Sequence, residues 1–144
     1  MIRYLTTSAL ALYLVAVTAL PARAQDANTL FLNLKSDDVW TQQMAFQFAR
    51  NYVELTGGDL VTFLNVRAVG IGNTEVPQHT TALTGKTPQA LLTDLIADGA
   101  QVFLCVGCTQ QAGLSIDDRI DGVEPSGPEL HEILAAPGTK VMSY

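Results

Sequence analysis

The stretch TLFLNLKSDD (residues 29–38) sets the expectation for the fold. Its first six residues form a compact apolar run of strand length, which is typical of a strand covered on both faces. The run ends abruptly in Lys35-Ser36-Asp37-Asp38, which has the composition of a helix start. We expect Ser36 or Asp37 to cap the free N–H groups, and Asp37 and Asp38 to suit the positive end of the helix dipole.

A long amphipathic helix is predicted to follow. Trp40, Met44, Phe48 and Tyr52 recur every four residues. With Ala45 and Ala49 beside them, they are expected to form its apolar face. The pair Gly57-Gly58 is expected to end this helix.

The same strand-then-helix order is predicted to repeat along the chain. Apolar runs at 60–64 and 101–104 predict two more strands, with a brief strand at Val123 and a last one at 139–144. Helices are predicted from Thr87-Pro88 to Gly99, over 109–114, and from Ser126-Gly127-Pro128 to Pro137. This order predicts an α/β fold with an open parallel sheet of about five strands and helices on both faces. The chain of 144 residues is long enough for one domain, which we assign to residues 25–144.

Residues 1–24 are interpreted as a cleaved secretory signal peptide. They hold an apolar run from Ala9 to Leu20 and end in Ala22-Arg23-Ala24, a small-x-small cleavage pattern. A membrane-spanning anchor is the alternative, but the run falls short of a full span. We therefore expect a periplasmic or secreted protein that begins at Gln25 and has no stable membrane anchor.

Charge excludes some classes of partner. The whole chain carries a net charge of −6, and cleavage after Ala24 leaves six Lys and Arg against 14 Asp and Glu, a net charge of −8. Nucleic acids and anionic membranes favour basic faces, so neither is expected to bind.

Both cysteines of the chain lie in Cys105-Val106-Gly107-Cys108, between a predicted strand and a predicted helix. A thiol at a helix start has its thiolate favoured by free backbone N–H groups, and thiolates attack disulfides, persulfides and electrophiles. A structural disulfide is the alternative in an oxidising compartment. A zinc site lacks ligands because only His79 and His131 accompany the pair, although two thiolates suit a soft ion such as Cu(I). No metal site and no cofactor are predicted.

Polar residues are predicted to gather beside this pair, because parallel strands all end at one edge of the sheet, where ligands bind. Gly107 would let a small ligand approach the backbone. The guanidinium of Arg67 would hold an oxyanion, and the alternative is a salt bridge or a subunit contact. The predicted substrate-binding residues at this edge are Ser36, Asp37, Asn65, Arg67, Gly107 and Gln110.

The chain resembles the DsrE family of sulfur-relay proteins. The resemblance is carried by NLKSDD (33–38) with Trp40, MAFQFA (44–49), FLNVR (63–67) and CVGCTQQAGL (105–114), and DGV (121–123) and KVMSY (140–144) match in type. It implies a five-stranded sheet, assembly into trimers or hexamers, and a sulfur-carrying cysteine at Cys105 with a second cysteine at Cys108. Relatives with the same cysteine spacing often carry a lysine where this chain has Gln110.

Three functions follow from these observations. The leading hypothesis is an exported sulfur carrier or sulfurtransferase in which Cys105 takes sulfane sulfur as a persulfide and Cys108 resolves it. Its expected partners are a small sulfur compound or a thiol or persulfide protein. The second hypothesis is a non-catalytic binding module with oxidised or metal-holding cysteines and a ligand surface shaped by residues 70–85. The third is a general dithiol oxidoreductase.

Overall fold

The computed structural model describes residues 28–144 of the chain. The predicted signal peptide at residues 1–24 and its cleavage site lie outside the described residues. Within residues 28–144, no helix combines the length and apolar character needed to cross a membrane.

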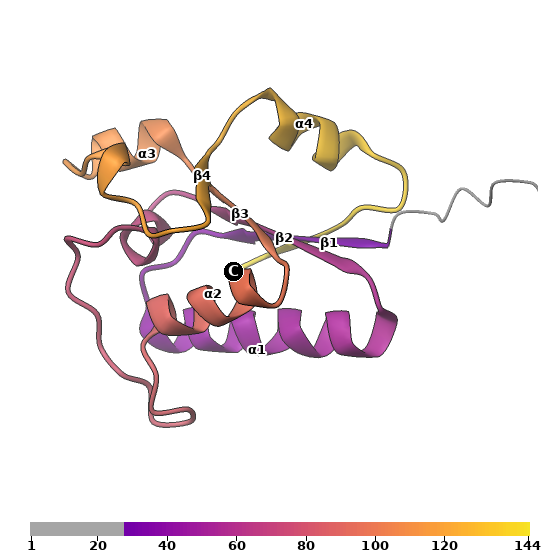
Figure 1. Cartoon of the computed structure of the whole chain (residues 1–144), viewed down its shortest axis with the longest axis horizontal. Helices are drawn as coiled ribbons and strands as arrows, with labels where there is room; N and C mark the ends of the chain where they lie inside the picture. The colour runs from indigo at the N-terminus through magenta and orange to yellow at the C-terminus, as the bar shows by residue number, and fades with distance from the viewer. Residues whose placement is uncertain (1–27) are drawn as a thin grey trace, which may run out of the picture.

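A five-stranded parallel sheet forms the middle layer, in the strand order β4-β3-β2-β1-β5 (Figure 1). This confirms the predicted α/β class and strand number. The helices and strands, in chain order with the two 3₁₀ helices named η, are β1 (Thr29–Leu34), α1 (Val39–Thr56), β2 (Asp59–Leu64), η1 (Ala68–Gly72), α2 (Pro88–Ala97), β3 (Gln101–Leu104), α3 (Val106–Gln111), η2 (Ile116–Asp118), β4 (Val123–Pro125), α4 (Pro128–Ala135) and β5 (Lys140–Ser143).

Helices cover both faces of the sheet, as predicted: α1 and α2 lie against one face and α4 against the other (Figure 1). The face covered by α1 and α2 carries the larger core, in which Leu32, Leu64 and Leu92 have no exposed surface. The face covered by α4 carries a smaller cluster of Phe31, Val61, Phe103 and Leu130. The strands alternate their side chains between the two cores, which explains why their sequences are apolar throughout.

The predicted helix ends are largely confirmed. Gly57 ends α1 in the left-handed conformation (φ 64°), and Thr87 caps α2 by accepting the N–H of Ala90 at 3.1 Å. The predicted cap of α1 was wrong, because Asp38 rather than Ser36 or Asp37 accepts the N–H of Thr41, at 2.7 Å. Ser36 instead accepts the N–H of Asp38 at 3.1 Å, which shapes the turn before the helix.

The predicted apolar face of α1 is confirmed only in part, because its Ala45 and Ala49 are buried but its larger side chains are not. Trp40 is 77% exposed, and Met44 and Phe48 are exposed as well. Of the four, Tyr52 is half-buried, and its hydroxyl donates to Asn28 at 2.7 Å. The side of the helix that carries Ala45 and Ala49 faces the sheet, because these small side chains let the backbone come close; the buried residues are Gln42, Gln43, Ala45, Phe46 and Ala49.

The long connection between η1 and α2 is tied to the core by Asn73, which is fully buried. Its side-chain amide donates to the carbonyl of Ser115 at 3.0 Å, and its Oδ1 accepts the N–H of Glu75 at 3.0 Å. Gln89 of α2 donates to the Asn73 carbonyl at 2.9 Å. These bonds fix the path of the loop past the carboxyl edge of the sheet.

Candidate functional site

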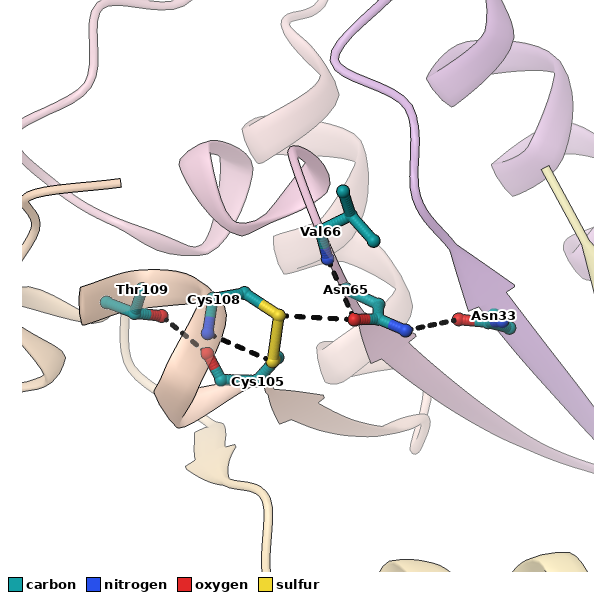
Figure 2. Close-up of a disulfide and its surroundings, with 6 residues drawn as sticks. All are labelled: Asn33, Asn65, Val66, Cys105, Cys108 and Thr109. Carbon is teal, nitrogen blue, oxygen red and sulfur yellow. Dashed lines mark hydrogen bonds between the residues drawn. A yellow bond between two sulfur atoms is a disulfide. The ribbon is translucent and has the colours of Figure 1, made fainter. Parts of the chain in front are cut away.

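The cysteine pair lies at the carboxyl end of β3. The backbone N–H of Cys105 donates to the carbonyl of Leu64 at 3.0 Å, which continues the pairing of β3 with β2 by one residue. Helix α3 then begins at Val106, three residues before the predicted start, and Cys105 is its N-cap. Its Sγ accepts the backbone N–H of Cys108 at 3.1 Å. The hydroxyl of Thr109 donates to the Cys105 carbonyl at 2.9 Å, so the turn is held at both ends (Figure 2).

Cys105 and Cys108 are joined by a disulfide, and their Cα atoms are 5.2 Å apart. Both residues are half-buried and pack against the larger core. The structure therefore holds the pair in its oxidised form. Reduction would release two thiols whose backbone positions are already fixed by β3 and α3.

Asn65, which follows β2, links this pair to the rest of the sheet edge. Its Oδ1 lies 3.2 Å from Cys108 Sγ (Figure 2). With the disulfide closed, that sulfur carries no proton and the approach is a sulfur–oxygen contact; a reduced Cys108 thiol would donate to the same oxygen. The Asn65 amide nitrogen donates to Asn33 Oδ1 at 3.3 Å, and Asn33 donates to Ser143 Oγ at 3.4 Å. A polar chain thus crosses from β5 through β1 and β2 to Cys108.

Val66 adopts a left-handed backbone conformation (φ 51°) directly after Asn65. A β-branched residue rarely takes this conformation, and it is strained. Its N–H donates to Asn65 Oδ1 at 2.8 Å. This bond fixes the Asn65 side chain with its oxygen, rather than its nitrogen, facing Cys108.

A cavity of about 850 Å³ opens beside the pair. Its walls come from four segments that the fold brings together, within residues 37–42, 66–71, 76–79 and 107–114. Apolar side chains such as Val39, Val69 and Ile71 make up much of the wall, and Cys108 lies in it. This volume falls in the range of small-molecule sites.

The predicted substrate-binding residues separate into three groups. Asp37, Arg67 and Gly107 line the cavity, and Arg67 Nη1 lies 3.3 Å from Asp37 Oδ2 in an exposed ion pair. Asn65 touches Cys108 without lining the cavity. The structure does not bring Ser36 or Gln110 into the wall: Ser36 holds the turn before α1, and Gln110 is exposed on α3.

Sequence reasoning gave no role to several residues at this site. Asn33 and Ser143 support Asn65, and Gln111, not Gln110, lines the cavity. His79, considered in the sequence only as a metal ligand, lies in the cavity wall, whereas His131 is exposed on α4. The period of a strand or helix gives no signal for a loop residue such as His79.

The charges of Asp37 and Arg67, which both line the cavity, balance each other in their ion pair.

The pKa of Asp38, which does not line the cavity, is lowered by two hydrogen bonds. The bond from the Thr41 hydroxyl has the larger effect, and the bond from the Thr41 backbone N–H has the smaller one. Within residues 28–144, no three His, Cys, Asp or Glu side chains cluster as metal ligands would.

Comparison with known proteins identifies the family. Residues 17–144 match the DsrE/DsrF-like family. The chain is similar to the crystal structure of the ychN protein from E. coli, at 26% identity and a TM-score of 0.63, covering 81% of this chain and 98% of that one.

A second solved structure has the same fold. It is MTH1491 from Methanobacterium thermoautotrophicum, described as a protein of unknown function, with 13% identity and a TM-score of 0.60 over 81% of this chain and 98% of that one. None of the curated proteins matches the chain. The family match covers most of the sequence, including every element of the sheet and the cysteine pair, and so the chain belongs to the DsrE/DsrF-like family.

Proposed function

We propose that this protein is a sulfur carrier or sulfurtransferase that holds sulfane sulfur as a persulfide on the Cys105–Cys108 pair. The observation that carries the proposal is the placement of this pair, in a family member, at the carboxyl edge of the sheet beside a cavity of about 850 Å³. Ligands of open parallel sheets bind at this edge.

The environments of the two sulfur atoms support different roles. Cys105 Sγ accepts a backbone N–H, which favours its thiolate, whereas Cys108 Sγ faces the carbonyl oxygen of Asn65, which favours a protonated thiol. In the reduced pair, Cys105 is the better nucleophile. Cys108 then resolves the intermediate.

The steps balance without an outside oxidant. The Cys105 thiolate attacks the outer sulfur of a persulfide R–S–SH, R–S⁻ leaves, and Cys105 becomes a persulfide. An acceptor thiolate can then take that sulfur and return Cys105 to its thiolate. Alternatively, Cys108 loses its proton and attacks Cys105 Sγ, HS⁻ leaves, and the disulfide seen in the structure forms.

The central prediction concerns the Cys105→Ser variant. Reduced wild-type protein treated with inorganic polysulfide should gain one sulfur, about 32 Da by intact mass, and peptide mapping should place it on Cys105. Cys105→Ser should lose this loading, because the remaining thiol lacks the donated N–H that favours a thiolate. Cys108→Ser is the matched control and should still load. Undiminished loading of Cys105→Ser would contradict the assignment.

We also propose the setting in which the protein acts. The signal-like composition of residues 1–24 supports export to the periplasm or beyond. The expected partners are a small sulfur compound or a thiol or persulfide protein, and the family resemblance supports assembly into a homo-oligomer.

A ligand-binding module is the second candidate. It is favoured by the closed disulfide together with the size of the cavity. In the same mass experiment, a loss of two hydrogens by the wild type together with no sulfur retained on Cys108→Ser, which cannot expel it, would instead favour a simple dithiol oxidoreductase. An unchanged mass would favour the binding module. Metal analysis of protein purified under reducing conditions would detect a soft ion held by the two cysteines.

A further inference from the structure

We propose that, when the pair is oxidised, an incoming sulfur compound bonds to Cys108 rather than Cys105, and that this compound is a small organic thiol or hydropersulfide with an apolar body. The inference rests on the proposed sulfur chemistry of the pair. It adds the entry point and the class of substrate.

Access favours Cys108. This residue lines the cavity, whereas the cavity wall does not include Cys105. Cys105 is half-buried like Cys108, but its contacts are with its own turn and with β2: its Sγ accepts an N–H from α3, and its backbone pairs with Leu64. Which sulfur of a disulfide is attacked depends on access, so a thiolate arriving through the cavity meets Cys108 Sγ.

The stability of the leaving thiolate also favours attack on Cys108. Attack on Cys108 expels Cys105 as a thiolate, and the Cys108 N–H already donates to that sulfur at 3.1 Å. Attack on Cys105 would leave the negative charge on Cys108, 3.2 Å from the Asn65 oxygen. Asn65 cannot simply present its amide nitrogen, because its oxygen is held by the N–H of Val66. The thiolate that is better stabilised leaves faster.

The cavity wall indicates the class of compound. The wall combines apolar residues, such as Val69, Ile71 and Val76, with neutral amides such as those of Gln78 and Gln111. His79 adds an imidazole to the wall. The two charged residues in the wall, Asp37 and Arg67, already pair with each other. A single hydrosulfide ion would cover almost none of the apolar wall, whereas an organic body in a cavity of about 850 Å³ removes apolar surface from water.

The exchange begins with the thiolate of the incoming compound. R–S⁻ attacks Cys108 Sγ and forms R–S–S–Cys108, the original disulfide breaks, and Cys105 leaves as a thiolate; R–S⁻ is oxidised and Cys105 is reduced. With a hydropersulfide, R–S–S⁻ gives a trisulfide on Cys108. Cys105 then attacks the central sulfur and R–S⁻ leaves, so that one sulfur atom is stored between the two cysteines. The net change moves one sulfur atom and needs no further oxidant.

The experiment treats the oxidised wild-type protein with benzyl mercaptan, whose body is apolar, or with 2-mercaptoethanol, a small polar thiol of similar acidity. After an acid quench, the freed thiol is alkylated and the peptide that holds both cysteines is fragmented in a mass spectrometer. The mixed disulfide is expected on Cys108 in about tenfold excess over Cys105. A majority on Cys105, or equal amounts on both, would overturn the proposed entry point.

The variant Ala112→Trp tests the class of compound. Ala112 is exposed and lines the cavity, so a tryptophan there should fill space without disturbing the core. The exchange rate with benzyl mercaptan should fall by about fivefold while the rate with 2-mercaptoethanol stays within about twofold. Ala135→Trp, at an exposed position of α4, is the matched control and should change neither rate. Unchanged benzyl mercaptan rates in Ala112→Trp would overturn the apolar class.

Failure of this inference differs from failure of the proposed function. If the reduced protein gains no sulfur from polysulfide while benzyl mercaptan still bonds to Cys108, the carrier role fails and the entry point stands. If polysulfide loads the reduced protein but the benzyl mercaptan adduct lies on Cys105, the carrier role stands and the proposed entry point fails. The mapping on the wild-type protein needs no variant, so it remains decisive if Ala112→Trp does not fold.

Discussion

The two faces of the sheet are packed to different depths. Under α1 and α2, leucines from the strands and helices pack with no exposed surface, as at Leu32 and Leu92. Under the eight-residue helix α4, the buried cluster is small, and its neighbours Phe63 and Ile133 are only half-buried. The same strands supply both faces, so the difference comes from the length and contacts of the covering helices.

This difference matters for the candidate site, because only one face of the sheet supports it. Cys105, Cys108 and Leu114 pack against the larger core, and the cavity wall takes Val39 and Gln42 from the start of α1. The face under α4 contributes no residue to that wall. The geometry of the cysteine pair is therefore expected to depend on the α1–α2 face far more than on α4.

The largest effect that tests this difference comes from a matched pair of leucine truncations. Leu92→Ala, on α2 with no exposed surface, should lower the free energy of unfolding by about 4 kcal/mol. Leu130→Ala, on α4 and 4% exposed, should cost about 2 kcal/mol, because half-buried neighbours can move into the space. Urea unfolding followed by circular dichroism measures both.

Both substitutions replace a helical leucine by alanine, so their effects on helix propensity cancel in the comparison. An unchanged dependence of the unfolding free energy on urea concentration would show that the unfolded state is the same in both. Equal losses at the two positions would contradict the thinner packing under α4.

A smaller effect is expected at the N-terminus of α1, where Asp38 anchors the helix beside the cavity. Its pKa is lowered from 3.8 by hydrogen bonds from Thr41, so its ionised form is favoured in the folded state. The stabilisation is fully present above the ordinary pKa and is lost as the pH falls through the lowered one.

The matched variant is Asp38→Asn, which keeps a capping group that does not titrate. Wild type should be the more stable at neutral pH, and its advantage should shrink as the pH falls below about 4. Urea unfolding at a series of pH values measures the difference. An advantage that stays constant across the acidic range would show that the Asp38 charge plays no part.

The smallest effect is expected at the exposed rim of the cavity. The side chains of Arg67 and Asp37 are 76% and 60% exposed, so water screens their attraction. Arg67→Ala should change the free energy of unfolding by less than about 0.5 kcal/mol. If urea unfolding shows a much larger loss of unfolding free energy, the Arg67–Asp37 pair must help to stabilise the face covered by α1 and α2.

Much of the fold could be predicted because strand and helix signals are local. The run at 29–34, the cap at Thr87 and the glycine at Gly57 each act within a few residues, and each lies where predicted. The direction in which α1 faces could not be predicted in this way. Trp40 and Met44 share the predicted apolar face with Ala45, but closeness to the sheet requires small residues, so Ala45 is buried whereas Trp40 and Met44 are exposed.

The candidate site was predictable to the extent that it follows strand ends. Asn65, Arg67 and the cysteines all lie at the edge where parallel strands finish. The wall formed by Val76 and His79 was not predictable residue by residue, because the bonds of Asn73 to distant parts of the chain fix the path of that loop.

The polar chain that ends at Cys108 also orders events in time as the protein folds. Cys105 and Cys108 are three residues apart, so their disulfide can close as soon as the local turn forms. Asn33 and Ser143 are 110 residues apart, and they meet only when β5 docks beside β1, a contact whose sequence separation makes it slow. The covalent part of the site thus depends on contacts that are local in the sequence, whereas its alignment by Asn65 depends on the docking of the last strand.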